Sequence, residues 1–544
     1  MAWPKIVYED VPVGAQDHTL VTAEDKQPWC NPQDMLEEIA TQQVATLEED
    51  YWVLGKNFRF FPDTPTSYNW GWWSASMCDE NGDFVTPPAM EWTLEGGLFT
   101  CIGLTFTFDP YGPTWPTWMR VQWYRDDELL ADKVFHPNGY QYSAFNTVRL
   151  FNRLVISFDH MTHGYRYLKV QRGIYGIIRT FGKDEYSNAS VYEAVNLISN
   201  ELEIGDLVFN VRNLSTLPFS FLRKQQLAVY HGDTFLGLRF ITAHDEMSDG
   251  RYKITAQDYL GLLSDSGDHF GGVYDGELSE DVLADILGDD IPYTLDDELK
   301  DIPIYGWLPK GARIDNLARV LFVIGGCAST FRSRVLRLFR PKTSETAIPI
   351  SLGGRTRTGT TVHTDKVVTG VQVTEHSFLP GTDTAEVYKG TLNGTDTVTF
   401  SEPMCALSIE GGTIEEWGAN YAIISGNGGM VTLTGTKYNH FTKVLTKENT
   451  LVEAGTIPNV KKCTDAYLVS PHNSAEVLER YFVYHRRNSY ATTELRLEGD
   501  EVGDLVSLGS ALYNGKVGNI TSVDLTLSKK LVANVRILLE DDTG

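Results

Sequence analysis

The sequence predicts a mainly β, multidomain protein that carries one small α/β insert. With 544 residues, the chain is too long for a single hydrophobic core, and about three to five domains are expected. Short segments of alternating apolar and polar residues, separated by Gly, Pro, Asn and Asp, run through most of it and are typical of β-strands. Helical periodicity is concentrated near residues 279–324. Hydrophobic residues make up 42% of the chain, which is ample for several packed cores.

The N-terminal part is predicted to contain an arm followed by a β-sandwich. Residues 1–81 are expected to form an arm and linker, with a short helix over 32–40 capped by Asn31 or Asp34, and an extended segment over 44–55. Residues 82–172 predict an antiparallel sandwich, because short strands recur between turn residues. The expected strands include 119–124, 129–135, 147–150 and 154–158.

The middle of the chain is predicted to hold a β-barrel over residues 173–265 and the α/β insert over 266–345. The segments 207–211, 227–230 and 251–256 alternate as half-buried strands do, and 231–234 fits a hairpin turn. In the insert, Ser279 is the expected N-cap of a helix that ends at Gly288. A second, amphipathic helix is expected over 312–324, closed by Gly325 and Gly326.

The C-terminal part returns to β-structure. Residues 346–460 predict a second β region of barrel type, and residues 461–544 predict a helix followed by closing barrel strands. The helix is expected over 474–484, capped by Ser470 or Asn473. Several short strands are expected in the second β region, at 367–374, 385–390, 397–400, 421–425 and 430–434.

The net charge of −26 disfavours ordinary nucleic-acid binding, because an acidic surface repels a phosphate backbone. The charge suits either simple solubility or the acidic lumen of a conduit that passes nucleic acid without binding it. No apolar run approaches the roughly 20 residues that a membrane span needs. Residues 1–5 lack the basic and apolar regions of a signal peptide, so synthesis and folding in a cytoplasm are expected.

No motif predicts a metal site, a cofactor or a catalytic residue. Residues 79–83 resemble the start of a calcium loop, but Phe84 and Met90 stand where glycine and glutamate are required. His160 and His163 lack a third ligand. The glycine-rich segment 353–359 is not followed by a helix, so an exposed loop is expected, and its two arginines can still pair with acidic neighbours.

The remaining candidates for chemistry are equally unspecific. Carboxylate pairs occur at 289–290 and 296–298, but nothing marks one of them as the pair that a glycosidase holds across a sugar. The six cysteines contain no C-x-x-C pair and are expected to be isolated, mostly buried thiols.

Tryptophans cluster in and before the predicted sandwich. Core packing is expected for most of them, above all for Trp123, which alternates with Val121. Trp115 and Trp118 lie beside prolines in a predicted loop and are the expected exposed pair. They are the candidates for carbohydrate binding or for an interface, with structure or interface favoured over sugar.

Several segments resemble the hub proteins of bacteriophage tails, which are the baseplate hub of contractile tails and the tail-tip hub of siphophages. Segments 205–211, 227–230, 235–237 and 252–258 are similar to the first barrel of that family. Segments 291–295 and 306–309 resemble its insert, and 515–525 resembles its closing barrel strands. Residues 45–48 with Trp52, followed by the sandwich, resemble a galactose-binding-like module of tail proteins.

This resemblance implies a homotrimer with two hub-type β-barrels per subunit. The trimeric ring would adapt a sixfold tail tube to a threefold tip and let DNA and the tape-measure protein pass. The implied partners are a distal tail or tube protein, the tape-measure protein and a tip spike or fibre protein. The implied location is the virion, at the tail tip or baseplate, after assembly in the host cytoplasm.

Physical reasoning agrees with side-by-side assembly, because unpaired strand edges seek partners. The chain shows no appended spike, peptidase or hydrolase domain, so no lytic role is expected. Two alternatives stay open at this point. One is a carbohydrate-binding tail module that recognises host cell-wall glycan, and the other, less favoured, is a glycoside hydrolase.

Overall fold

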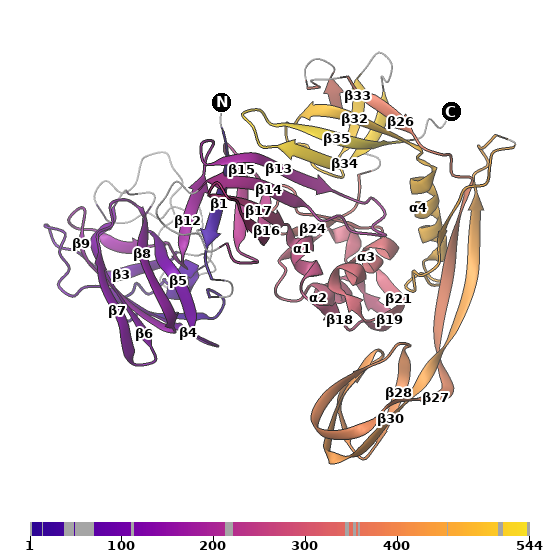
Figure 1. The fold of residues 1–544 in the computed structure, drawn as a ribbon, viewed down its shortest axis with the longest axis horizontal. Coiled ribbons are helices and arrows are strands. Elements are labelled where there is room, and N and C mark those ends of the chain that lie inside the picture. The colour runs from indigo at the N-terminus through magenta and orange to yellow at the C-terminus, as the bar shows by residue number, and fades with distance from the viewer. Residues whose placement is uncertain are drawn as a thin grey trace. The chain divides into compact units, whose positions relative to one another are not determined.

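The computed structural model (Figure 1) confirms a mainly β, multidomain protein. The chain forms two compact units. The N-terminal unit comprises Val7–Phe181 and Ser215–Leu227, and the C-terminal unit comprises Met1–Ile6, Gly182–Leu214 and Ala228–Gly544. The structure describes residues 3–12, 15–36, 48, 70–109, 112, 114–212, 221–342, 347–351, 355–356, 359–453, 455–509 and 515–540.

The N-terminal unit contains the predicted β-sandwich. One sheet has the order β2-β4-β9-β6-β7, and a second has the order β11-β5-β8, with antiparallel pairing throughout. A separate pair joins β3 and β10. The elements of this unit are β2 (Thr19–Thr22), η1 (Pro32–Leu36), β3 (Trp72–Met77), β4 (Ala89–Leu94), β5 (Phe99–Thr107), β6 (Pro116–Arg125), β7 (Glu128–Phe135), β8 (Gln141–Phe151), β9 (Arg153–Met161), β10 (Tyr167–Val170), β11 (Arg172–Tyr175) and β12 (Ile177–Phe181).

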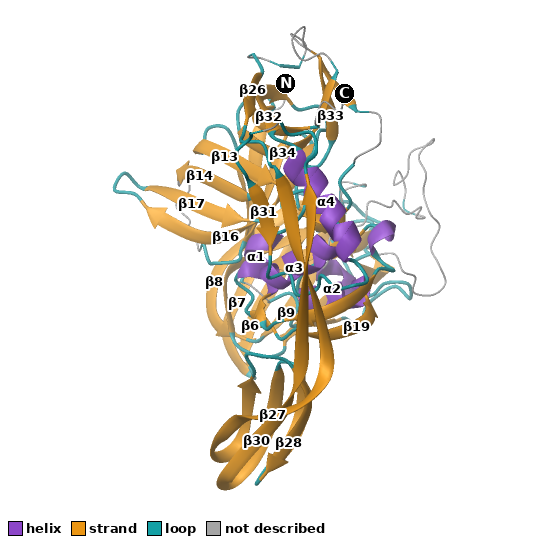
Figure 2. Ribbon diagram, turned by 90° about the vertical axis from the view of Figure 1, so that its right-hand side faces the viewer, coloured by secondary structure: helices purple, strands orange, loops and turns teal. Residues whose placement is uncertain are grey.

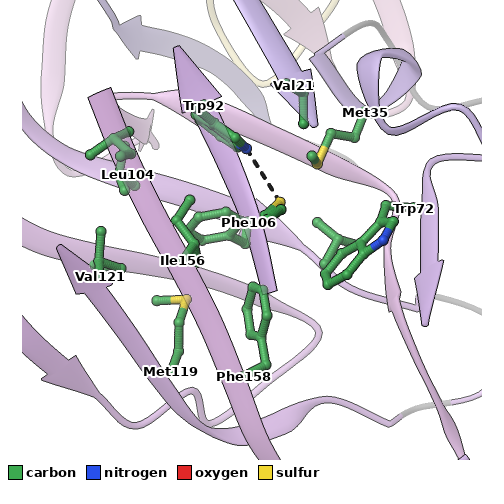
Figure 3. Packing of buried hydrophobic residues seen from close by; sticks show 14 of the residues in the cluster. Val21, Met35, Trp72, Trp92, Leu104, Phe106, Met119, Val121, Ile156 and Phe158 are labelled. Carbon is green, nitrogen blue, oxygen red and sulfur yellow. Dashed lines mark hydrogen bonds between the residues drawn. The ribbon is translucent and has the colours of Figure 1, made fainter. Parts of the chain in front are cut away.

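Aromatic side chains fill the sandwich core (Figure 3). Every second residue of β4, and of β9 as far as Phe158, is buried, which is the period of a strand with one face on a core. Trp92 packs at ring-centroid distances of 5.8 Å from Phe106 and 4.9 Å from Tyr175. Residues 1–81, expected as an arm and linker, contribute Val21 and Met35 to this core.

The short helix expected over 32–40 is the 3-10 helix η1 in its described part, and Asn31 caps it by accepting the N–H of Gln33 at 3.3 Å. Residues 37–40 lie outside the described residues, as does the expected extended segment 44–55 apart from Glu48. Glu48 is fixed by a buried ion cluster, since Lys169 Nζ lies 2.5 Å from its carboxylate and 3.0 Å from that of Asp109. Both acids compensate the buried ammonium, which would otherwise be costly.

The C-terminal unit is organised by one long sheet with the order β15-β16-β17-β14-β13-β34-β35-β32-β26. Strand β1 (Pro4–Asp10) precedes β15 in this order and crosses from one unit to the other. Strand β33 joins the sheet through β34 and carries β25 in parallel. The strands are β13 (Tyr186–Ala194), β14 (Asp206–Arg212), β15 (Gln226–His231), β16 (Thr234–Glu246), β17 (Arg251–Gln257), β25 (Ile348–Ser351), β26 (Thr361–Thr364), β32 (Ser489–Arg496), β33 (Leu505–Gly509), β34 (Lys516–Thr526) and β35 (Val532–Leu539).

The strands predicted to form the first barrel and the predicted closing barrel strands, two separate strand sets, lie in the same sheet. Residues Ser190–Ala194 of β13 pair antiparallel with Ser522–Thr526 of β34. The first set therefore continues into the closing strands without a break in hydrogen bonding. The boundaries of the six predicted segments stay predictions.

The α/β insert follows β17 and contains the two predicted helices. Helix α3 begins at Arg313 and ends at Ile324, and Gly325 closes it with a left-handed φ of 75° that favours glycine. The elements are α1 (Tyr259–Ser264), β18 (Asp268–His269), β19 (Gly272–Leu278), α2 (Ser279–Leu287), β20 (Tyr293–Leu295), η2 (Asp297–Leu299), β21 (Pro303–Leu308), β22 (Gly311–Ala312), α3 (Arg313–Ile324), β23 (Cys327–Ser329) and β24 (Leu336–Phe339).

The predicted N-cap of α2 is wrong. Leu278 is the N-cap residue of α2, and Ser279 is its first helical residue. The buried Ser279 hydroxyl lies 2.5 Å from the carbonyl of Leu299 and 2.6 Å from that of Lys300. It therefore makes a tertiary contact and does not cap the helix. Asn473, one of the two residues predicted to cap helix α4 (Ser474–Arg486), is its N-cap residue, but its side chain makes no capping bond and instead accepts the N–H of Ser470.

Residues 370–448 form a long two-stranded ribbon (Figure 2). Strands β27 (Gly370–Thr399) and β30 (Tyr421–Glu448) have 30 and 28 residues, so the prediction of several short strands is wrong. Bulges interrupt the pairing of the two strands without ending them, since the register shifts between Pro380 and Thr384, between Glu386 and Tyr388, and between Leu392 and Asn393. Strands β28 (Met404–Glu410), β29 (Thr413–Gly418) and β31 (Val460–Cys463) complete the sheet.

The far end of the ribbon has its own small core, and a buried asparagine attaches it to the insert. Val398, Ala422, Ile424 and Leu433 belong to this core, and we call the segment 392–433 the distal lobe. Asn420 Nδ2 donates to the carbonyls of Phe270 at 2.7 Å and Leu308 at 2.8 Å. Its Oδ1 accepts the indole N–H of Trp307 at 2.7 Å. The Asn420 side chain therefore hydrogen-bonds to three groups of the insert.

A buried charged cluster connects the sheet, helix α1 and the insert. Arg239 of β16 donates to the carboxylate of Glu193 in β13, and both side chains are buried. Asp258 caps α1 by accepting the N–H groups of Leu260 and Gly261. The hydroxyl of Thr330 lies 3.3 Å from the Glu193 carboxylate and 3.0 Å from that of Asp258.

Electrostatics and packing both show how tightly this cluster is enclosed. Burial raises the pKa of Glu193 to about 7 and also raises the pKa of Asp258. A Cβ atom at Gly205 would lie 2.8 Å from Asp258 Oδ2 and 2.9 Å from Glu193 Cδ. Only glycine fits at position 205, since any side chain would displace one of the carboxylates.

Arg239→Met is expected to destabilise the C-terminal unit by about 3–5 kcal/mol at pH near 8, because two buried carboxylates lose their counter-charge. The loss of stability should be smaller near pH 5, because Glu193, whose pKa is raised, is then mostly protonated and uncharged. Urea unfolding at both pH values measures this. The matched change Arg496→Met, at a side chain that is 65% exposed, should cost less than about 0.5 kcal/mol. Equal losses in the two variants would refute the role of the cluster.

Asn420→Ala is expected to remove the side-chain partner of two carbonyls and one indole N–H, at up to about 1–3 kcal/mol for each group that stays unsatisfied. The distal lobe should then open locally, and hydrogen exchange should accelerate in residues 306–308 and 419–424. Asn427→Ala, at an exposed asparagine of the same lobe, is the control. Unchanged protection in Asn420→Ala would show that the lobe is held by other contacts.

Candidate functional site

Trp115 and Trp118, the two tryptophans expected to be exposed, are both half-buried. Trp118 lies within β6 and pairs in register with Asp159 of β9, so its expected loop position is wrong. The pairing of β6 with β9 begins at Pro116, which extends the strand into the predicted loop. Trp115 packs against the sandwich core, and its carbonyl accepts the N–H of Thr162 at 3.1 Å. A role of either side chain in carbohydrate binding or in an interface stays a prediction.

The other clustered tryptophans are core residues. Trp72, Trp73 and Trp123 are fully buried, and Trp70 is 5% exposed. The prediction of core packing for Trp123 is confirmed.

The loops with candidate ligands are polar turns. The Asp79 carboxylate accepts the N–H groups of Asn81 at 2.8 Å and Asp83 at 2.9 Å, as an Asx turn does. His163 Nδ1 lies 3.1 Å from its neighbour Thr162 Oγ1. Within the described ranges, no three His, Cys, Asp or Glu side chains gather as metal ligands would.

The predicted carboxylate pairs take part in ion pairs of the insert. Asp290 lies 2.8 Å from Arg313, Asp297 lies 2.6 Å from Lys300, and Glu298 lies 3.8 Å from Arg340. In the glycine-rich segment 353–359, Arg355 contacts Asp500 and lies 3.7 Å from Glu498, so its predicted acidic neighbours are confirmed. Residues 353–354 and 357–358 lie outside the described residues.

The cysteines are buried or half-buried free thiols, as predicted. Burial raises the pKa of Cys101 and of Cys327 to about 12, which keeps both thiols neutral. Among the helices that the structure describes, none is long and apolar enough to cross a membrane.

The candidate functional surface is the open end of the long sheet in the C-terminal unit. Strand β26 pairs with β32 on one side, and no other described strand pairs with its second side. Thr361, His363 and Thr364 are exposed, and Val362 is half-buried. A strand edge of this kind presents unpaired backbone N–H and C=O groups to any approaching strand.

Polar and aromatic side chains cover the sheet face beside this edge. The ring of Tyr490 lies 3.9 Å from the Arg536 guanidinium and is stacked on His363 at a ring-centroid distance of 4.8 Å. A shallow hollow of about 580 Å³ on this face is lined by residues that include Tyr192, Thr361, Thr492, Glu494, Asp524 and Asn534. The other face of β34 and β35 is apolar and buried. Such a surface can pair with another chain through its backbone and polar groups.

A histidine pair lies near the start of the ribbon. His376 Nε2 lies 3.0 Å from the carbonyl of Thr464, so it donates, and Nδ1 accepts from His440 Nε2 at 2.9 Å. The His440 ring stacks on Phe378 at 4.4 Å. Burial and the neighbouring His440 lower the pKa of His376, although Asp465 opposes this, and burial lowers the pKa of His440. Two protonated rings would place two N–H groups against each other.

Acid is therefore expected to loosen this contact. Both pKa values are lowered in the folded chain, so the stability is present above about pH 6.5 and is lost as the pH falls. Hydrogen exchange of residues 464–469, corrected for the intrinsic rate, should accelerate between about pH 7 and pH 5.5. His440→Phe, which keeps the stacking, should flatten this change, and His363→Phe should not. An acid response as large in His440→Phe as in the wild type would contradict the assignment.

The comparisons with known proteins give similarity in structure only. No family model and no curated protein matches the chain. The chain is similar in structure to three solved tail proteins. Each match covers 66–67% of this chain. The first is the 43 kDa tail protein of prophage MuSo2 from Shewanella oneidensis, with TM-score 0.39, 9% identity and 95% of that protein covered.

The second is prophage tail protein gp18 from Listeria monocytogenes, with TM-score 0.39, 11% identity and 92% covered. The third is a tail protein from Neisseria meningitidis, with TM-score 0.41, 10% identity and 97% covered.

Proposed function

We propose that this protein is a structural hub of a phage or phage-like tail tip or baseplate. Three subunits would form a ring that adapts the sixfold tail tube to the threefold tip. The observation that carries the proposal is the element order of the C-terminal unit. Two strand sets flank a compact α/β insert, share one sheet through β13 and β34, and end at the open edge β26. This is the order of elements for which the sequence resembles tail hubs.

The open edge supports a ring of identical subunits. An exposed strand edge invites pairing, and head-to-tail contacts between identical subunits close into a ring when the rotation fits. The proposed partners are a distal tail or tube protein, the tape-measure protein and a tip spike or fibre protein, and the proposed location is the virion.

The charge of the chain fits a conduit. With a net charge of −26, the protein repels a phosphate backbone, so DNA is expected to pass through the ring without being held. The N-terminal sandwich is proposed to be the galactose-binding-like module that residues 45–52 and the following strands resemble.

The oligomeric state tests this proposal. Native mass spectrometry is expected to give a species of three times the 61.0 kDa subunit mass. The double change Val362→Lys with Thr364→Lys places two charges on the edge strand and should yield monomers, because edge lysines block strand pairing. Val85→Lys with Thr86→Lys, at exposed loop residues of the N-terminal unit, is the matched control. A wild-type chain that stays monomeric, both alone and with a tube protein, would contradict the proposal.

A further inference from the structure

The outer edge of β30 between Asn439 and Glu448 is open. Strand β28 pairs with β30 only as far as Lys437, and Tyr438 N–H donates to the carbonyl of Pro403 at 3.3 Å. Beyond Tyr438, the described strands pair with β30 only on its β27 side. This edge differs from β26 in its length and in its side chains.

Each side chain from Asn439 to Val444 is exposed, although both faces of a strand are represented. Phe441 is 56% and Val444 is 59% exposed. These two residues point to opposite faces, because they are three positions apart in a strand. Leu379 of β27 is 56% exposed and pairs with Asn439, so it lies on the same face as Phe441. Exposed apolar side chains on both faces are typical of an edge that accepts a further strand.

The charges along this edge are of one sign, in contrast to the chain as a whole. The stretch Lys437–Lys447 contains three lysines, one histidine and no acid, in a chain of net charge −26. All three lysines occupy odd positions and therefore share one face with Phe441, while residues 438, 440, 442, 444 and 446 on the other face carry no acid or lysine.

The lysines differ in how they are neutralised. Lys437 lies 2.5 Å from Glu402, and Lys447 contacts Glu479. For Lys443, the described residues offer no carboxylate within ion-pair distance. Its cross-strand neighbour Glu375 accepts from the Ser474 hydroxyl at 2.7 Å. Lysines alone can protect an edge from unwanted pairing. An edge that only prevents strand pairing does not require an exposed Phe441 between its lysines.

We propose that the outer edge of β30, from Asn439 to Thr446, is the docking site for an extended acidic strand of a partner protein. The partner strand would add to the ribbon through backbone hydrogen bonds. Asp or Glu on one of its faces would meet Lys443 and the flanking lysines, and an apolar residue between them would cover Phe441 and Leu379. Its other face would be uncharged, to match Thr442 and Val444. This site is independent of the subunit ring.

The test uses the full chain and three capped peptides. In the first peptide glutamate alternates with valine or threonine, in the second lysine replaces glutamate, and the third is the first with alternate backbone nitrogens methylated. Fluorescence anisotropy should show binding of the first peptide alone, weakening as salt is added. Hydrogen exchange should show new protection confined to residues 439–446.

Lys443→Glu should weaken binding of the acidic peptide by about tenfold or more through like-charge repulsion. Lys389→Glu, the same change at an exposed lysine of β27, should leave the affinity unchanged. Equal binding of the acidic and basic peptides, or protection elsewhere, would overturn the proposal. Protection of 439–446 that rises with protein concentration without peptide would assign the edge to a second copy of this chain, and would overturn it as well.

Discussion

The C-terminal unit depends on a buried guanidinium that pairs with one buried carboxylate and compensates the charge of a second. Arg239 lies on β16, Glu193 on the strand that joins the two strand sets, and Asp258 at the start of helix α1. A buried charge without a partner is strongly destabilising, whereas a compensated one is tolerated. The insert closes this cluster through Thr330. Sheet and insert are therefore coupled, because separating them would expose the cluster or leave its members unpaired.

This coupling explains how the unit can present open strand edges and still have a defined structure. The insert and α1 are fixed from the inside by charge, and the distal lobe is attached through Asn420. The second side of β26 and the outer side of β30 beyond Tyr438 pair with no strand that the structure describes. Rigid edges with different side chains, one neutral and one lined with lysines, can serve different partners.

The sequence predicted the elements whose signals are local. Helix α3 and the strands of the sandwich follow from periodicity over about ten residues, and Trp123 follows from its alternation with Val121. The ribbon was predicted as several strands, because Gly381 and Gly394, which lie between the expected strands, look like turn residues when the pairing strand is unknown. The contact between Glu193 and Arg239 spans 46 positions and that between Asn420 and Phe270 spans 150. No pattern in the chain points to pairs so far apart.

The proposed function rests on the pairing of the open edge of the long sheet with another subunit. Hydrogen exchange of residues 361–364 across a dilution series tests this most directly, because backbone pairing protects amide hydrogens. The account predicts slow exchange at high protein concentration that becomes fast as the ring dissociates, while residues 190–194 stay protected throughout. Fast exchange of residues 361–364 at every concentration, in a preparation that is nevertheless oligomeric, would contradict it.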